Sequence, residues 1–212
     1  METKKTAKLI GLTGYYCAGK NHVARLLERR GLAVLDVDKL GHEVISTEKE
    51  RLAARFGDDI LDANGLVDRK RLGAKVFSKS EELEALEDII HPAANRQTLA
   101  WIESRTEKTC VINAALLHRT SVFQTFDAII IVESRFLVRL FRAKKRDALP
   151  WTVLLKRFYS QRKFHAQYSA GKADIYKVEN SSFSGFRRSF LHNKLEKRID
   201  EILSLMGIEF KV

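Results

Sequence analysis

A glycine-rich string near the start of the chain limits what it can fold into more than any other feature. A short apolar run over residues 9–12 comes shortly before Gly14-Tyr15-Tyr16-Cys17-Ala18-Gly19-Lys20, and apolar residues at helical spacing follow that string. A Gly-x-x-x-x-Gly-Lys string between a strand and a helix is typical of a loop whose backbone N–H groups bind phosphate, while the lysine reaches the outer phosphates. The residues expected to bind the nucleotide are Gly14, Cys17, Ala18, Gly19, Lys20, Asn21 and His22.

Asn21 stands where such a loop usually has Ser or Thr, whose hydroxyl binds Mg²⁺. An amide carbonyl oxygen can also bind Mg²⁺, but the asparagine side chain is longer than that of serine. We therefore take Asn21 as the candidate metal ligand and expect the ion to be displaced or held through water.

The composition is that of a globular protein with an anionic partner. Apolar residues make up 45% of the 212 residues, charged residues make up 31%, and no apolar run approaches the roughly 20 residues that span a bilayer. The first residues lack the apolar core of a signal peptide, and the two cysteines form neither a metal motif nor a disulfide framework, so we expect a cytoplasmic protein that does not enter a membrane. The net charge of +11 suits nucleic acid, a membrane surface or phosphorylated small molecules, and charge alone does not choose among them.

A second buried strand is expected over residues 31–38, which end in Asp36 and Asp38. Ligands of parallel α/β sheets bind at the carboxyl ends of the strands, so both carboxylates are candidates to face the phosphate loop. A helix is expected to follow from residue 39, and Asp38 can equally be its N-cap. The two interpretations of Asp38 remain open at this point.

Between residues 38 and 105 the strand signal disappears and helical patterns follow one another. The expected helices cover residues 48–56, 69–77, 81–90 and 93–103. Such a helical insertion is a natural place for a second substrate. His91-Pro92 is expected to start the last of these helices, with the proline in its first turn. His91 is a candidate substrate contact, although a partly buried histidine bonded to backbone is the more common arrangement.

Strands return over residues 109–113 and 126–132, both continuous runs rich in β-forming residues, of the kind that parallel sheets bury. A basic helical region follows over 135–172. Such a region is usually a solvated helix face, but kinases also use arginines from a closing segment to stabilise a transferring phosphoryl group. Arg142 and Arg146 are four residues apart, share one helix face and form the candidate clamp. A strand over 174–179 and a closing helix come last, and the apolar stripe of that helix is Leu195, Ile199, Ile202, Leu203 and Met206.

The order of these pieces resembles the dephospho-coenzyme A kinase family over most of the chain. The similarity rests on short strings, namely Gly11-Leu12-Thr13-Gly14, Gly19-Lys20, Leu35-Asp36-Val37-Asp38, Gly65-Leu66-Val67-Asp68-Arg69, Leu72-Gly73, Val76-Phe77, His91-Pro92, Leu116-Leu117, Arg142 to Asp147, and Ala173-Asp174 with Asn180. The resemblance implies an α/β fold of the P-loop NTPase type, in which a parallel sheet is flanked by helices and carries a helical substrate-binding insertion and a helical lid. It assigns residues 1–37, 106–137 and 173–212 to the nucleotide-binding core, residues 38–105 to the helical domain for the CoA precursor, and residues 138–172 to the lid.

The same resemblance implies ATP-dependent phosphorylation of the ribose 3′-hydroxyl of dephospho-CoA, the last step of coenzyme A biosynthesis, with ATP and Mg²⁺. At the matching positions, Asp38 would orient the acceptor hydroxyl and take its proton, and Lys20 would hold the β- and γ-phosphates. Arg142 and Arg146 would stabilise the transferring group. The implied substrate contacts are Asp36, Arg69 and His91. For Arg69, a structural ion pair with Asp68 is the alternative.

Several positions depart from the family pattern, and they fall on the loop and the metal. The family's loop usually reads Gly-Gly-Ile-Gly-Ser-Gly-Lys-Ser-Thr, so Tyr15 and Cys17 replace glycines, which alone take positive φ without steric cost. Two acids that the family has after the third strand are replaced by Asn113 and Arg119, which reduces the negative charge available to Mg²⁺.

These departures leave two alternatives to an active dephospho-CoA kinase. One is a degenerate relative that binds nucleotide or CoA with little activity, and the other is a different small-molecule P-loop kinase. A nucleic-acid-binding module is a further possibility, but no nucleic-acid motif is present, so we expect a small-molecule substrate and no nucleic acid. The sequence does not indicate an oligomeric state.

Overall fold

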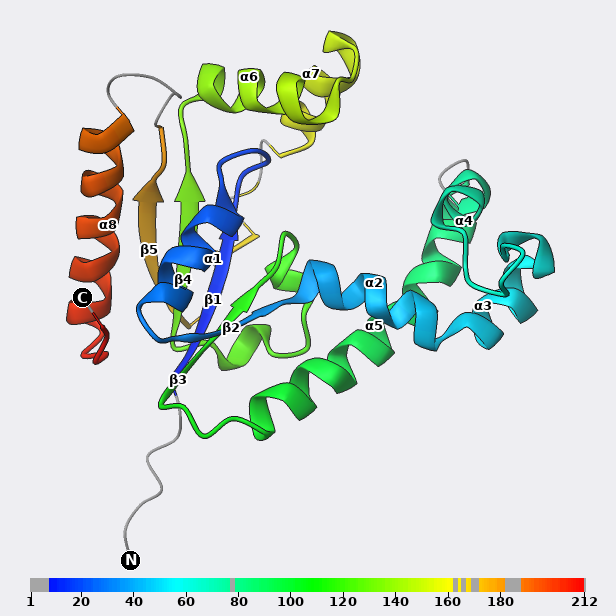
Figure 1. Ribbon diagram of the computed structural model, residues 1–212, viewed down its shortest axis with the longest axis horizontal. Coiled ribbons are helices and arrows are strands. Elements are labelled where there is room, and N and C mark those ends of the chain that lie inside the picture. Colours follow the sequence, from blue (N-terminus) through cyan, green and yellow to red (C-terminus); the bar gives the residue numbers. More distant parts are fainter. Residues whose placement is uncertain are drawn as a thin grey trace, which may run out of the picture. The chain divides into compact units, whose positions relative to one another are not determined.

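Figure 1 shows the computed structural model, which describes residues 8–76, 79–161, 164, 167–168, 172–181 and 188–211. The contacts between residues divide it into two compact units. The first unit takes in Met1–Leu35 and Arg105–Val212 and contains the phosphate loop, and the second unit is Asp36–Ser104. In the described part of the chain, no helix is both long enough and apolar enough to cross a membrane.

The first unit is built on a five-stranded sheet with the order β2-β3-β1-β4-β5. Its strands are β1 (Lys8–Gly14), β2 (Ala33–Asp36), β3 (Thr109–Asn113), β4 (Ala128–Glu133) and β5 (Asp174–Glu179). The pairs β1–β3, β1–β4 and β4–β5 are parallel. The predicted α/β class with a parallel sheet is therefore confirmed, and β1, which leads into the phosphate loop, is the central strand.

Helices cover this sheet because its central strands are apolar on both faces. Ile10, Leu12 and Ile130 are fully buried and pack in one cluster with residues of α1 (Lys20–Arg29) and α8 (Arg188–Leu205). The α8 residues in this cluster are Leu195, Ile199, Ile202 and Leu203, with Met206 partly buried against them. The apolar stripe predicted for the closing helix is therefore confirmed.

The second strand is shorter and more exposed than predicted. β2 ends at Asp36, all of its residues are only half-buried, and it lies at an edge of the sheet. The helix α2 (Val37–Thr47) starts at once, and the Asp36 carboxylate accepts a hydrogen bond from the Lys39 backbone N–H at 3.1 Å. Asp36 therefore caps α2, and the N-cap interpretation of Asp38 is wrong, because Asp38 already lies in the first turn.

The second unit is helical, with its own apolar core. It consists of α2, α3 (Lys49–Phe56), η1 (Asp58–Ile60), α4 (Arg69–Val76) and α5 (Ser80–Glu103). The buried residues of its main core cluster are Leu52, Phe56, Ile60, Leu72 and Val76. The helix predicted over 69–77 is confirmed as far as Val76, and Phe77 lies outside the described residues.

The helices predicted over 81–90 and 93–103 are one continuous helix, α5. Pro92 lies in its interior, so the expectation that His91-Pro92 starts a helix is wrong. An interior proline removes one backbone hydrogen bond and costs about 3 kcal/mol. Burial of Ala93 and Ala94 against Val44 of α2 favours the helical path on the far side of the proline and offsets part of that cost.

The basic region forms two helices, α6 (Phe136–Asp147) and α7 (Trp151–Ser160), which belong to the first unit. They lie beyond the end of β1 at which the phosphate loop begins (Figure 1). Three of their buried residues form a small cluster that packs against the partly buried Tyr16 and Cys17 of the loop, namely Ala143, Leu154 and Phe158. We refer to α6 and α7 as the lid helices.

Candidate active site

The phosphate loop connects β1 to α1 and ends at Gly19, the N-cap of α1. Gly19 has φ +94°, and a Cβ atom there would lie 2.2 Å from Asn180 Nδ2. A Cβ atom on Gly14 would lie 2.7 Å from the Val132 carbonyl oxygen. The first turn of α1 contains no acidic residue, so the helix itself does not compensate its positive dipole end. These are the features that a phosphate-binding loop requires.

Cys17 has φ +58° although it is not glycine, which costs about 1–2 kcal/mol. Hydrogen bonds hold this part of the loop in place. Ala18 N donates to the Tyr15 carbonyl oxygen at 2.9 Å, and Arg142 Nη1 donates to the Ala18 carbonyl oxygen at 3.2 Å. The chain thus keeps, at some cost, a backbone conformation that the family's glycine takes freely.

Arg142 of α6 is bound to backbone carbonyl groups. Besides its bond to Ala18, its Nη1 donates to the Asn180 carbonyl oxygen at 3.0 Å. Asn180 Nδ2 donates in turn to the Ala18 carbonyl oxygen at 2.9 Å. Burial lowers the pKa of the Arg142 guanidinium. This predicted clamp residue therefore joins the loop to α6 and to the residue that follows β5.

A second set of contacts joins both lid helices to Tyr16. Arg146 donates from Nε and Nη2 to the two carboxylate oxygens of Asp147, at 2.7 and 3.2 Å. The Tyr16 hydroxyl donates to the same carboxylate, and Arg157 Nη1 donates to the Tyr16 hydroxyl oxygen at 3.2 Å. The hydrogen bond from Arg146 is the main reason that the pKa of Asp147 falls to about 2. The second predicted clamp residue, Arg146, is thus placed beside the loop together with Arg157, which the sequence reasoning missed.

Arg139 is a further missed arginine on α6. Its guanidinium lies 4.6 Å from the centroid of the Tyr15 ring and 5.0 Å from that of Phe158. Its Nε is buried and has no hydrogen-bond partner among the described residues, and burial lowers its pKa. Its sequence spacing could have identified Arg139, because it precedes Arg142 by three residues and so lies on the same helix face.

Asn21 contacts Asn113, the other asparagine that stands where the family has a different residue. Asn113 Nδ2 donates to Asn21 Oδ1 at 3.3 Å. Asn113 is 1% exposed, and its Oδ1 is buried without a hydrogen-bond partner in the described part of the chain. That part contains no group of three or more His, Cys, Asp or Glu side chains that could hold a metal ion. Two neutral amide oxygens fit a Mg²⁺ ion whose remaining ligands are phosphate oxygens and water.

The remaining predicted site residues lie in the second unit. Asp36 caps α2, and Asp38 is exposed in its first turn. His91 is half-buried in the interior of α5. Arg69 is exposed at the start of α4.

The alternative of an Asp68–Arg69 ion pair is not found. Asp68 pairs with Arg71 at 3.5 Å, and its carboxylate accepts hydrogen bonds from the backbone N–H groups of Lys70 and Arg71. These backbone bonds lower the pKa of Asp68. The arrangement caps the start of α4 and leaves the Arg69 side chain to other partners.

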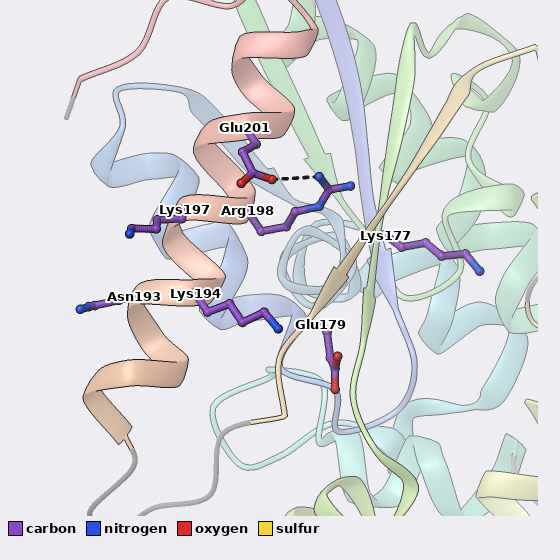
Figure 2. A pocket seen from close by; sticks show the side chains of 7 residues that line it. All are labelled: Lys177, Glu179, Asn193, Lys194, Lys197, Arg198 and Glu201. Atoms are coloured by element: carbon purple, nitrogen blue, oxygen red, sulfur yellow. Dashed lines mark hydrogen bonds and ion pairs between the residues drawn. The ribbon is translucent and has the colours of Figure 1, made fainter.

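A crevice of about 550 Å³ lies between β5 and α8 (Figure 2). Its lining residues are Lys177, Glu179, Asn193, Lys194, Lys197, Arg198 and Glu201. Arg198 is paired with Glu201 at 3.0 Å, and Figure 2 shows Lys194 pointing toward β5. None of the lining residues belongs to the phosphate loop or the lid helices, and none was predicted as a site residue. The crevice contributes to the positive charge of the chain, so that charge is not confined to the candidate active site.

Comparisons with known proteins agree with this geometry over nearly the whole chain. The family model of dephospho-CoA kinase matches residues 8–183. The dephospho-CoA kinase of Treponema pallidum is 30% identical over 210 residues, covering 94% of this chain and 96% of that protein. That of Treponema denticola is 33% identical over 201 residues, covering 90% of each. The crystal structure of TT1252 from Thermus thermophilus is similar with a TM-score of 0.72 at 26% identity, covering 92% of this chain and 98% of that one.

Proposed function

Because the chain belongs to the dephospho-CoA kinase family, we propose that it transfers the γ-phosphoryl group of ATP to the ribose 3′-hydroxyl of dephospho-CoA, the final step of coenzyme A biosynthesis. The observation that carries the proposal is the family match over residues 8–183, a range that includes the phosphate loop, Asp38 and both lid helices. The proposal includes a cytoplasmic location, a small-molecule substrate and no nucleic-acid partner.

In this proposal the phosphate loop and the start of α1 bind ATP. Lys20 and the backbone N–H groups hold the β- and γ-phosphates, which the uncompensated helix dipole attracts. Asn21 would hold Mg²⁺ through Oδ1, alongside phosphate oxygens and water. The ion would supply positive charge at the β- and γ-phosphates. Because the chain offers neutral amides rather than acids here, the nucleotide itself contributes most of the charge that attracts the metal.

Asp38 orients the acceptor hydroxyl and accepts its proton. A ribose hydroxyl is a weak nucleophile, so a carboxylate within hydrogen-bond reach assists the attack on phosphorus. Asp38 suits this role because it is exposed and because Asp36, rather than Asp38, caps α2. Arg69 is exposed and has no ion-pair partner among the described residues, so it can bind a phosphate of the CoA precursor. Asp36 and His91 complete the proposed substrate set.

The two predicted clamp arginines take different parts in the transfer. Arg146 lies at the surface of the loop and contributes positive charge to the transferring group. Arg142 donates to loop carbonyl groups, so it acts chiefly by keeping the loop and α6 together while the phosphoryl group moves.

An acceptor panel tests the proposal. The purified protein is incubated with ATP and either dephospho-CoA, adenosine or a nucleoside monophosphate, with and without Mg²⁺, and ADP release is measured. Dephospho-CoA is expected to be the preferred acceptor, and Lys20→Ala and Asp38→Asn should each lower kcat by about 100-fold or more. Tight binding of ATP and dephospho-CoA without any product would contradict the proposal and favour the degenerate relative.

A further inference from the structure

Two arginine side chains from different helices converge on one carboxylate beside the phosphate loop. Arg146 of α6 binds both oxygens of Asp147, and Arg157 of α7 lies 3.5 Å from Oδ2. One carboxylate neutralises one guanidinium, so the cluster keeps an excess positive charge. Both guanidinium groups also lie over the Tyr16 ring, 5.1 and 5.7 Å from its centroid. The excess charge therefore sits against the middle of the phosphate loop.

Arg157 is held less firmly than Arg142. Arg142 Nη1 has carbonyl acceptors at 3.0 and 3.2 Å. Arg157 has the Tyr16 hydroxyl at 3.2 Å and a carboxylate at 3.5 Å that already accepts from Arg146 and Tyr16, and its side chain is 50% exposed. A guanidinium has five donors in a planar fork that matches phosphoryl oxygens. Arg157 thus has donors available for an anionic ligand, whereas Arg142 is committed to the protein.

The backbone of Tyr16 gives a reason for an arginine at this position. In a phosphate loop the N–H groups usually point at the phosphates, but the Tyr16 N–H donates to Gln161 Oε1 at 2.8 Å. The Phe158 ring also packs edge-on against the Tyr16 ring, with centroids 5.4 Å apart. These contacts fix the end of α7 to the loop. They also remove one backbone donor from the phosphate site, and the Arg157 guanidinium supplies positive charge beside the same residue.

We infer that Arg157 is a catalytic residue that binds the transferring phosphoryl group together with Arg146, and that Asp147 is a positioning residue for both guanidinium groups. The inference rests on the proposed function. In that reaction the bond from the γ-phosphorus to the ADP oxygen breaks as the bond to the acceptor oxygen forms, the acceptor proton passes to Asp38, and ADP leaves. Charge on the transferred group spreads over its outer oxygens, so a guanidinium in contact with them stabilises the transition state more than bound ATP.

The test compares Arg157→Ala and Arg157→Lys with a matched control on the same helix, Lys156→Ala. Lys156 is an exposed neighbour of Arg157 on α7, so its variant should behave as wild type. Arg157→Ala should lower kcat by about 100-fold while the KM for dephospho-CoA stays within about twofold; the loss is smaller than for a sole arginine finger because Arg146 remains. Its affinity for ADP with aluminium fluoride, an analogue of the transition state, should fall by a similar factor, and its affinity for ADP alone should not change.

The outcomes separate the inference from the proposed function. A kcat of Arg157→Ala within twofold of wild type would overturn the inference even if the wild-type protein phosphorylates dephospho-CoA well. If the wild type forms no product, the proposed function fails, and equal binding of ADP with aluminium fluoride by wild type and Arg157→Ala would overturn the inference as well. Arg157→Lys keeps the charge but not the planar fork of donors, so its kcat should fall by less than that of Arg157→Ala. If Arg157→Ala does not fold, the same measurements on Arg157→Lys test the inference.

The positioning role of Asp147 has its own readout. Asp147→Asn removes the charge that holds two guanidinium groups together, so kcat and affinity for the transition-state analogue should fall together, and Asp147→Glu should restore a large part of both. Some loss of stability in Asp147→Asn is expected on either view, but a purely structural role would change the affinity for the analogue and that for ADP by the same factor. That result would contradict the role given to Asp147.

Discussion

Replacing Gly19 by alanine should damage the phosphate loop through two effects that the structure separates. The φ of +94° is unfavourable for any residue with a Cβ atom, by about 1–2 kcal/mol. The new Cβ atom would also lie 2.2 Å from Asn180 Nδ2, so Asn180 must move and its 2.9 Å bond to the Ala18 carbonyl oxygen is lost. A buried polar group left without its partner costs about 1–3 kcal/mol. The free energy of unfolding should therefore fall by about 2–5 kcal/mol.

The matched control is Gly65→Ala. Gly65 also has a positive φ, +69°, but no atom lies within 4 Å of the position its Cβ would take, so only the backbone cost applies. For a chain of this size, each kcal/mol lowers the melting temperature by about 2–4 °C. Thermal unfolding should show a loss of about 2–8 °C for Gly65→Ala and about 4–20 °C for Gly19→Ala, with the larger loss in Gly19→Ala.

Calorimetric titration with ATP completes this experiment. Gly19→Ala should weaken ATP binding about tenfold or more, because the displaced loop no longer presents its N–H groups to the phosphates. Gly65→Ala lies in the second unit and should bind ATP as wild type does. Equal melting temperatures for the two variants, with unchanged ATP affinity in Gly19→Ala, would refute the account of the contact between Gly19 and Asn180.

Three further predictions follow from the site. Asn21→Ser should change the Mg²⁺ concentration that gives half-maximal activity more than the KM for dephospho-CoA, and equal effects on both would show that Asn21 is not near the metal. The pKa of Asp147 is lowered from 3.8 to about 2, so its ionised form stabilises the fold above about pH 4. This contribution is lost as the pH falls toward about 2. The difference in unfolding free energy between wild type and Asp147→Asn should therefore shrink between about pH 4 and pH 2 and stay constant above about pH 5. Fluorescence anisotropy should detect no binding of single- or double-stranded DNA at about 150 mM salt, and affinity with a steep salt dependence would contradict the small-molecule assignment of the +11 charge.

The parts of the fold that followed from sequence are those in which one strong local pattern decides. Ile10 and Leu12 lie in a continuous apolar run, which is the mark of a strand buried on both faces, and this strand is central in the sheet. Leu195 and Ile199 begin an apolar stripe at helical spacing, and the stripe is buried. The Gly14 to Lys20 string predicted both the loop and its position between a strand and a helix, which are β1 and α1.

The misjudged boundaries are those in which tertiary contacts override a local signal. Asp36 and Asp38 are both good N-cap residues, and the sequence alone does not say which one ends the strand. Pro92 is a strong helix-start signal, yet burial of Ala93 and Ala94 carries α5 through it. Sequence therefore placed these elements but not their ends.

The candidate site shows the same division. Arg142 and Arg146 could be paired by their spacing on one helix, but spacing does not reveal that Arg142 donates to loop carbonyl groups. Arg157 could not be paired with Arg146 at all, because they belong to different helices and meet at Asp147 and Tyr16. The roles given to Asp38, Lys20 and the arginines remain predictions, for which the experiments above provide the tests.

Single-turnover transfer with γ-labelled ATP tests the central claim most directly. The wild-type protein, in excess over labelled ATP and with Mg²⁺ and dephospho-CoA present, should move the label to the ribose 3′-hydroxyl, as shown by mass spectrometry and phosphorus NMR of the product. Lys20→Ala should move none on the same timescale. Label that remains on ATP with the wild-type protein, or that appears on another hydroxyl or as free phosphate alone, would contradict the account.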